Sequence, residues 1–272
     1  MPCSYDFLIA DLLLRVLSPR ELQIPDNFQP FLITSNLGRK ADILLEIHFQ
    51  TMDPDSVPVL QKVYWSRGEY IVCQEPAGRG TPCRLFLPPG FEEDFCRQGN
   101  WLNYIPMERL LLPYGRVILH ASAVNYQGKA FLFSAPSGGG KSTHAAIWRD
   151  CFGAEILNGD KVILYAGSNG LMACGSPIAG SSGIYIPRCV PLASVFLLRK
   201  APANRVAPVT QREAILALYS EAVKSARDAD FNSRLFDCIA SLKREINVYS
   251  LECLPHKSAV ECILQTTEGI TP

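Results

Sequence analysis

The sequence has no excess of charge of either sign. Lysine and arginine total 26 residues, and aspartate and glutamate also total 26, so the formal net charge is zero. A general nucleic-acid binder carries a basic face that appears as an excess of lysine and arginine. We therefore expect no nucleic-acid partner, although the composition does not exclude a local basic patch.

The sequence also lacks an apolar run long enough to span a bilayer. Its first residues are apolar, but they include Asp6, Asp11 and Arg15. They lack the basic start and the small-residue cleavage site of a signal peptide. We therefore expect no membrane partner and a cytoplasmic location.

Closely spaced cysteines are missing as well. The ten cysteines include no C-x-x-C pair, and the nearest two are Cys253 and Cys262. Cysteine-based metal sites and compact disulfide scaffolds usually show tighter spacing. We therefore expect reduced and mostly buried thiols.

The chain does have enough apolar sequence for a sizeable core. Of its 272 residues, 48% are hydrophobic and 19% charged, as is typical of globular proteins. Residues 1–104 contain short apolar or alternating runs between turn formers, which predict a smaller β-rich region without a recognisable chemical motif. Residues 105–272 alternate helical and strand patterns and predict a mixed α/β domain.

In the second region, the patterns predict the elements in a definite order. Residues 116–124 and 130–135 are expected to form a hairpin, followed by a helix over 141–151 that Gly153 ends in a left-handed conformation. Thr210 and Glu213 form a T-x-x-E capping box at a helix start. The other expected elements are a short helix at 105–114, a strand at 155–160 that continues over 161–167, a small-residue loop at 175–183, a central buried strand at 190–201, helices at 210–225, 228–244 and 256–266, and a strand at 246–253.

The most informative segment is residues 131–148, FLFSAPSGGGKSTHAAIW. An apolar strand leads into a glycine turn, and a helix follows. Glycines let backbone N–H groups approach an anion closely, and the helix start adds unpaired amides and the positive end of its dipole. The segment therefore predicts a nucleotide-binding phosphate loop made of Ser137, Gly138, Gly139, Gly140, Lys141, Ser142 and Thr143.

Two side chains of this loop have expected roles. Lys141 should contact the β- and γ-phosphates, and the Ser142 hydroxyl should ligate Mg²⁺, so ATP and Mg²⁺ are the expected cofactors. The motif departs from GxxxxGK[ST] because Ala135 stands where the first glycine is expected. The alternative is a surface turn before a helix that happens to contain a lysine.

Three further segments stand in order around the loop. The guanine-reading N-K-x-D segment and the L-S-G-G-Q signature are absent from the sequence. The segments are Leu119-His120-Ala121-Ser122 upstream, Leu157-Asn158-Gly159-Asp160 downstream, and then the loop that Gly175-Ser176-Pro177 opens. Over about residues 105–200 the chain resembles the superfamily of HPr kinase/phosphorylase and ATP-type phosphoenolpyruvate carboxykinase. It is most similar to the small kinase-like members often associated with peptide-modifying gene clusters.

The resemblance implies a P-loop nucleotide-binding core with a mixed sheet over residues 105–272. It leaves residues 1–104 outside, as a region that could present the acceptor. It implies that Asp160 is a metal-linked or catalytic carboxylate and that His120 lies near the transferred group. Two departures are Gly159, where the family has the first residue of an Asp-Asp pair, and Thr143, where HPr kinases have an acidic residue.

Several residue roles stay open at this point. If Asp160 binds the metal, His120 becomes the stronger candidate for the general base. Arg188 could stabilise transferred charge, and an ordinary surface arginine is the alternative. Ser122 shares a strand face with His120 and could hydrogen-bond toward the site. His144, on the helix behind the loop, is expected to pack or to lie on the surface.

The leading hypothesis is an ATP-dependent phosphotransferase that transfers the γ-phosphate to a hydroxyl, on a serine of a peptide or small protein. One alternative is a kinase for a small metabolite such as free serine. Another is a nucleotide-binding regulatory module with little turnover, which the lost carboxylate at Gly159 favours. The sequence specifies neither ATP against GTP nor the oligomeric state.

Overall fold

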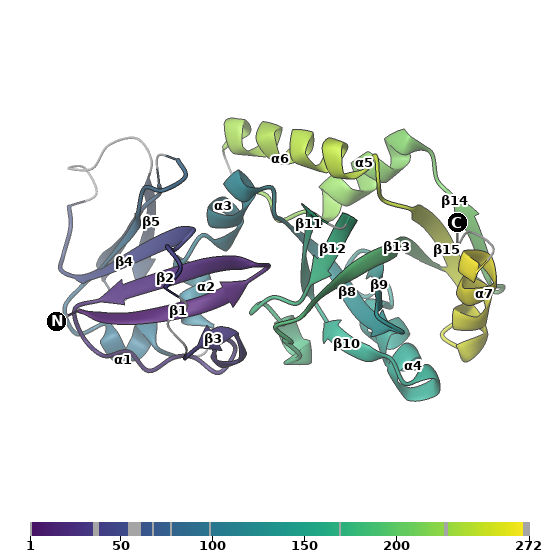
Figure 1. Cartoon of the computed structure of the whole chain (residues 1–272), viewed down its shortest axis with the longest axis horizontal. Helices are drawn as coiled ribbons and strands as arrows, with labels where there is room; N and C mark the ends of the chain where they lie inside the picture. The colour runs from purple at the N-terminus through teal and green to yellow at the C-terminus, as the bar shows by residue number, and fades with distance from the viewer. Residues whose placement is uncertain are drawn as a thin grey trace. The chain divides into compact units, whose positions relative to one another are not determined.

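The computed structural model describes residues 2–34, 38–53, 61–66, 68–76, 78–97, 99–168, 170–225 and 228–268. The chain forms two compact units, Met1–Tyr114 and Gly115–Pro272, coloured from purple to blue and from teal to yellow in Figure 1. The division falls after Tyr114 and not at the expected residue 104. The reason is that Arg109 pairs with Glu75 at 2.6 Å and the Tyr114 hydroxyl donates to the Asp42 carbonyl, so this segment is bound within the first unit.

The first unit is built mainly of strands, as expected. Its seven-stranded sheet has the order β3-β1-β2-β4-β7-β6-β5 and mixes parallel and antiparallel pairs. Phe7, Phe28, Phe95 and Trp101 are fully buried and form an aromatic cluster in its core. The elements are β1 (Cys3–Ile9), β2 (Leu12–Ser18), η1 (Gln29–Phe31), β3 (Leu32–Ile33), β4 (Ile43–Phe49), β5 (Gln61–Ser66), β6 (Glu69–Gln74), β7 (Cys83–Leu87), α1 (Glu92–Phe95), α2 (Asn100–Tyr104), α3 (Met107–Leu111) and η3 (Leu112–Tyr114).

The second unit is mixed α/β; the predicted elements occur in the expected order, and β12 and β14 are strands that were not predicted. Its strands are β8 (Val117–Tyr126), β9 (Lys129–Ser134), β10 (Glu155–Asn158), β11 (Lys161–Gly167), β12 (Gly170–Cys174), β13 (Cys189–Lys200), β14 (Arg205–Pro208) and β15 (Val248–Cys253). Its helices are α4 (Lys141–Phe152), η4 (Gly180–Ser182), α5 (Gln211–Glu221), α6 (Ala229–Leu242) and α7 (Lys257–Glu268).

The strands of this unit form an eight-stranded sheet in which β8 and β13 are long and change partners along their length. The main path is β10-β8-β11-β12-β13-β15-β14, and β9 pairs with both β8 and β13. β13 lies between β9 and β15 and is parallel to both. The carboxyl ends of these three strands therefore meet at one edge, which is where ligands bind in open α/β sheets.

Helices pack against both faces of the sheet (Figure 1). On one face, the aromatic core of Phe133, Trp148 and Phe196 lies under α4 and α7. On the other, Val117 and Leu119 of β8 meet apolar residues of α5 and α6. Because side chains alternate along a strand, the even-numbered residues His120 and Ser122 face away from α6 and toward the α4 side.

Local sequence signals set two helix ends and one hairpin, and these three predictions are confirmed. Gly153 caps α4 with φ 68°, a left-handed conformation that glycine adopts without strain. Thr210 and Glu213 form the capping box at the start of α5, and β8 and β9 pair as a hairpin. α5 ends at Glu221, short of the predicted residue 225.

The expectation that 161–167 continues the strand before it is wrong. The strand is interrupted between Asn158 and Lys161, although both halves pair with β8. The Asn158 side-chain oxygen accepts hydrogen bonds from the backbone N–H groups of Asp160 and Lys161, both at 2.8 Å. An asparagine side chain that bonds ahead in this way competes with the strand ladder and turns the chain.

The expectation of reduced, mostly buried cysteines is also wrong. Cys174 and Cys189 form a disulfide, because the register of β12 and β13 places them opposite each other with a Cα–Cα distance of 4.1 Å. Among the described free cysteines, Cys73 and Cys83 are buried, whereas Cys151 is exposed. Within the described ranges, none of the helices has the length and apolarity needed to cross a bilayer.

Candidate functional site

The segment between β9 and α4 forms a tight loop that only glycine permits at three positions. Gly138 and Gly140 have φ angles of 74° and 101°, in the region that side chains disfavour. At Gly139, a Cβ atom would lie 2.5 Å from the Ala135 Cβ and 2.8 Å from the Pro136 oxygen. The loop is therefore tightly folded, and residues 138–140 have no side chains that could cover its backbone N–H groups.

The helix that follows offers unpaired amides at its start. Its first helical hydrogen bond runs from the His144 N–H to the Gly140 oxygen at 2.9 Å. The N–H groups of Lys141, Ser142 and Thr143 precede this bond, so they have no acceptor within the helix. Gly140 has no side chain that could cap them. The arrangement fits an anion at the positive end of the helix dipole.

Lys141 is almost completely buried, with 8% of its surface exposed. Its ammonium group donates to the Ala135 carbonyl at 2.7 Å. Across the described parts of the chain, no carboxylate forms an ion pair with it. A buried cation is costly unless an opposite charge compensates it, so this position is suited to an anionic ligand.

Two neighbours hold the start of α4 in place. The buried Ser122 hydroxyl on β8 donates to the Lys141 carbonyl at 3.0 Å, which joins this strand to the helix. His144 is buried and lies edge-on to Phe133 with ring centroids 4.4 Å apart, so the expectation of a packed residue is confirmed. Burial disfavours the charged imidazole and lowers the pKa of His144 to about 4.

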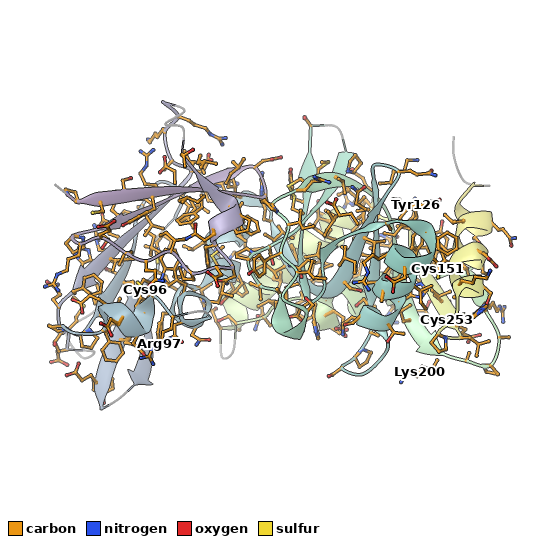
Figure 2. All side chains as sticks on the ribbon, turned by 90° about the horizontal axis from the view of Figure 1, so that it is seen from below. Cys96, Arg97, Tyr126, Cys151, Lys200 and Cys253 are labelled. Atoms are coloured by element: carbon orange, nitrogen blue, oxygen red, sulfur yellow. A yellow bond between two sulfur atoms is a disulfide. The ribbon has the colours of Figure 1, made fainter. Side chains whose placement is uncertain are left out.

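A cavity of about 850 Å³ opens beside the loop. It extends from residues 138–144 along α4 to the carboxyl ends of β13 and β15, where Lys200 and Cys253 lie (Figure 2). Beyond the loop it is lined by Ile147, Leu198, Lys200, Ala201, Pro202, Cys253, Leu254 and Pro255. No sequence motif predicts a functional role for these residues. The signal that could have found them is the rule that ligands bind at the carboxyl ends of parallel strands.

A polar cluster forms where β10 gives way to β11. The His120 Nε2 lies 3.0 Å from Asp160 Oδ1, and the Lys161 ammonium lies 2.8 Å from Asp160 Oδ2. The fully buried Asn158 fixes this turn, since its amide also donates to the carbonyls of Ser176 and Ile178. The structure therefore brings together His120 and Asp160, the two residues that the resemblance singled out.

The small-residue loop packs directly on this cluster. A Cβ atom at Gly180 would lie 2.7 Å from the Asp160 carboxyl carbon. At Gly159, it would lie 2.4 Å from the Ser182 hydroxyl oxygen. Glycines at both positions allow this close contact, and a second carboxylate at residue 159 would have to displace Ser182.

Glu221 is a member of this cluster that sequence reasoning missed. Its carboxylate lies 3.6 Å from His120 Nδ1, so the imidazole stands between two carboxylates. The bridge between Leu119 and Ala222 brings the end of α5 beside β8. No local motif connects Glu221 with His120, and only the packing of α5 on β8 reveals the pair.

Arg188 is not brought together with the other predicted residues. Its guanidinium pairs with Glu155 at the start of β10, on an exposed part of the surface. Within the described ranges, no hydrogen bond or ion pair joins it to His120, Asp160 or the loop. Its proposed role at the transferred phosphate stays a prediction.

The two predicted protein ligands of Mg²⁺ belong to different groups of residues: Ser142 lines the cavity beside the loop, and Asp160 belongs to the polar cluster with His120. This ion prefers oxygen ligands and usually binds through one or two carboxylates together with phosphate oxygens and water. Asp160 and the exposed Ser142 hydroxyl are the two predicted protein ligands. The described residues contain no group of three or more His, Cys, Asp or Glu side chains arranged as a metal site. A metal here would therefore depend on the nucleotide for much of its coordination.

Comparisons with known proteins give one family match. A search of curated proteins finds no match. The solved structure of the Hpr(Ser) kinase/phosphatase from Coxiella burnetii aligns with 56% of this chain and 97% of its own, at 14% identity and a TM-score of 0.33, a likeness that supports no conclusion. The model of the family described as "SynChlorMet cassette protein ScmC" matches residues 101–263, which is more than half of the chain. The chain therefore belongs to the ScmC family.

Proposed function

We propose that the second unit is a nucleoside-triphosphate-dependent phosphotransferase that acts on a hydroxyl acceptor. The observation that carries this proposal is Lys141, a buried lysine whose described partner is a neutral carbonyl at the mouth of a glycine loop. An anion would supply the missing opposite charge, and the amides at the start of α4 would add hydrogen bonds.

The proposed roles within the nucleotide site follow the phosphate-loop motif and the family resemblance. The loop amides and Lys141 would hold the β- and γ-phosphates, with Ser142 and Asp160 as protein ligands of Mg²⁺. The bound metal would neutralise charge that develops on the phosphate oxygens. Phosphoryl transfer requires mainly positioning and charge stabilisation, and a rigid loop next to a buried lysine suits both.

His120 would serve the acceptor hydroxyl as the general base, because Asp160 is engaged as a ligand of the metal. A general base must lie within hydrogen-bond reach of the proton it accepts. Glu221 acts as a positioning residue. Its carboxylate faces Nδ1 of His120, whereas Asp160 faces Nε2. We assign the proton to His120, with the Glu221 carboxylate orienting the imidazole.

A serine of a peptide or small protein is the proposed acceptor. The description of the ScmC family names a cassette protein. This description fits a kinase-like protein associated with a peptide-modifying gene cluster. The alternative of a nucleotide-binding module with little turnover is favoured by one observation. Gly159 lies against Ser182, so the second carboxylate of the resembled family has no space here.

The test is transfer of label from γ-labelled ATP with Mg²⁺ to candidate peptides, to free serine or to neither. Lys141→Ala and Asp160→Asn should each lower turnover by on the order of a hundredfold, because each removes charge stabilisation or metal binding at the transferred group. Lys129→Ala and Asp230→Asn, at exposed positions outside the site, are the matched controls.

Each outcome separates the candidates. Label on a peptide supports the proposal, and label on serine alone moves the acceptor to a small metabolite. Nucleotide binding without transfer supports the regulatory module. If Lys141→Ala binds and turns over ATP as the parent does, the loop is not a phosphate site and the proposal fails.

A further inference from the structure

The cavity beside the loop has an apolar half that the proposed phosphate contacts do not use. We define this apolar compartment as the space lined by Ile147, Leu198, Ala201, Pro202, Leu254 and Pro255. Lys200 and Cys253 complete its lining beyond the loop and the start of α4. The size of the whole cavity, about 850 Å³, lies in the range of sites for drug-sized ligands and cofactors.

The compartment is continuous with the phosphate loop because α4 lines both. Thr143 and Ile147 are four residues apart on this helix and therefore lie on one face, one turn apart. Leu198 and Lys200 share a face of β13, and Leu254 follows the last residue of β15. For a ligand whose phosphates are held at the start of α4, the group that follows the phosphates thus lies beside the apolar compartment.

One residue of the compartment is a large apolar side chain with much exposed surface. Leu254 is 40% exposed, one of few large apolar side chains of the described chain with so much exposed surface. A single exposed leucine is ordinary, but here it lines a cavity together with two prolines. A flat ring placed against these residues would remove apolar surface from water on both partners.

We propose that the apolar compartment receives the base of the bound nucleoside triphosphate and accepts adenine and guanine alike. This inference rests on the proposed function, and it settles a choice that the sequence left open. The compartment holds the base by surface contact, and its side chains do not read the hydrogen-bonding edge.

The chemistry of the lining carries the second half of the proposal. Six of the eight lining side chains beyond the loop have no hydrogen-bonding atom. Burial raises the pKa of the Cys253 thiol, so this group stays neutral and is a weak donor. Lys200 is exposed, so its ammonium group stays in water and has no fixed position against the base. Sites without hydrogen-bonding groups discriminate poorly between ligands of similar shape.

The experiment compares three ligands, each with Mg²⁺: ATP, GTP and inorganic tripolyphosphate. Binding to the full chain is measured by calorimetry for the parent and for Leu254→Asn, which keeps the branched shape of the side chain and adds polarity at an exposed position. Ala201→Trp is a second variant, which fills the compartment. Leu216→Asn, at an exposed leucine on α5, is the matched control, and thermal melts verify that each variant is folded.

In the parent, ATP and GTP should bind within about tenfold of each other, since no described side chain separates them. Leu254→Asn should weaken both by about tenfold, and Ala201→Trp should weaken them further. Tripolyphosphate, which has no base, should bind all variants as it binds the parent. Leu216→Asn should change none of these affinities.

Three results would overturn the inference while leaving the proposed function intact. They are unchanged ATP affinity in both compartment variants, a parallel loss of tripolyphosphate binding, and a preference of more than about a hundredfold for one purine. If the parent binds neither ATP nor tripolyphosphate, the proposed function itself fails, and the inference fails with it.

Discussion

At the scale of single residues, the departure from the phosphate-loop consensus has a steric explanation. Ala135 occupies the position where glycine is expected, and its methyl group lies where a side chain at residue 139 would extend. The two positions share one small space, so a methyl group at Ala135 requires glycine at 139. The Ala135 carbonyl is also the acceptor for Lys141. The alanine is therefore compatible with a closed loop.

The buried imidazole of His144 makes stability depend on pH. Its pKa falls from 6.5 in the unfolded chain to about 4 in the folded chain, so between these values the unfolded chain binds more protons. The free energy of unfolding keeps its full value above pH 6.5. It decreases as the pH falls toward about 4, by about 3 kcal/mol in total. Chemical unfolding across this pH range should show this decrease in the parent, and His144→Leu should lack it.

The same series has an internal control. His256→Asn replaces an exposed histidine with a residue that can still bond the start of α7. Its unfolding free energy should depend on pH as that of the parent does. If the unfolding free energy of His144→Leu depends on pH as steeply as that of the parent, another group causes the pH dependence.

At the scale of elements, the disulfide and the small-residue loop form one structural unit. Cys174 and Cys189 join the end of β12 to the start of β13, and the loop between them packs on Asp160 through Gly180. The backbone also pairs the loop with β10, through the bridge between Asn158 and Tyr185. The position of the Asp160 carboxylate therefore depends on both ends of this loop.

Removal of the disulfide should lower stability. The bond spans 15 residues, and a closed loop of this length stabilises the folded state by about 3 kcal/mol through the unfolded chain. Thermal unfolding of Cys174→Ala/Cys189→Ala, and of the parent with a reductant, should show lower midpoints than the oxidised parent. Cys151→Ser, at an exposed thiol, should not. Equal midpoints in all samples would contradict the bridge.

At the scale of the whole molecule, the two units have separate cores and only one of them contains the proposed site. Trp101 belongs to the aromatic core of the first unit, and Trp148 lies behind the loop in the second. The match to the ScmC family begins at residue 101 and runs through most of the second unit. The remaining N-terminal region, predicted to present the acceptor, has no catalytic assignment.

Nucleotide should therefore protect one unit and not the other. At a concentration of about 100 times its Kd, a ligand stabilises the unit that binds it by about 2.7 kcal/mol, which slows exchange through global opening by on the order of a hundredfold. Hydrogen exchange with ATP and Mg²⁺ should slow in α4, β13 and β15 and stay unchanged in β1, β2 and β4. Lys141→Ala should abolish the difference. Equal protection of both units would contradict a site confined to the second.

The sequence alone determined the phosphate-loop motif, the hairpin before it, the capping box of α5 and the glycine cap of α4. These features depend on residues within a few positions of one another, so local backbone preferences are sufficient to specify them. The interruption at Asn158 was missed, although it too is local, because the strand pattern on both sides conceals an asparagine turn.

Only the tertiary structure decided which distant residues meet. The pairing of His120 with Asp160 follows from the register of β8 with β11, and Glu221 joins them because α5 packs on β8. The disulfide depends on the register of β12 and β13, and the apolar compartment depends on the common edge of parallel strands. Contacts of this kind form through long-range packing, which no local pattern of residues encodes.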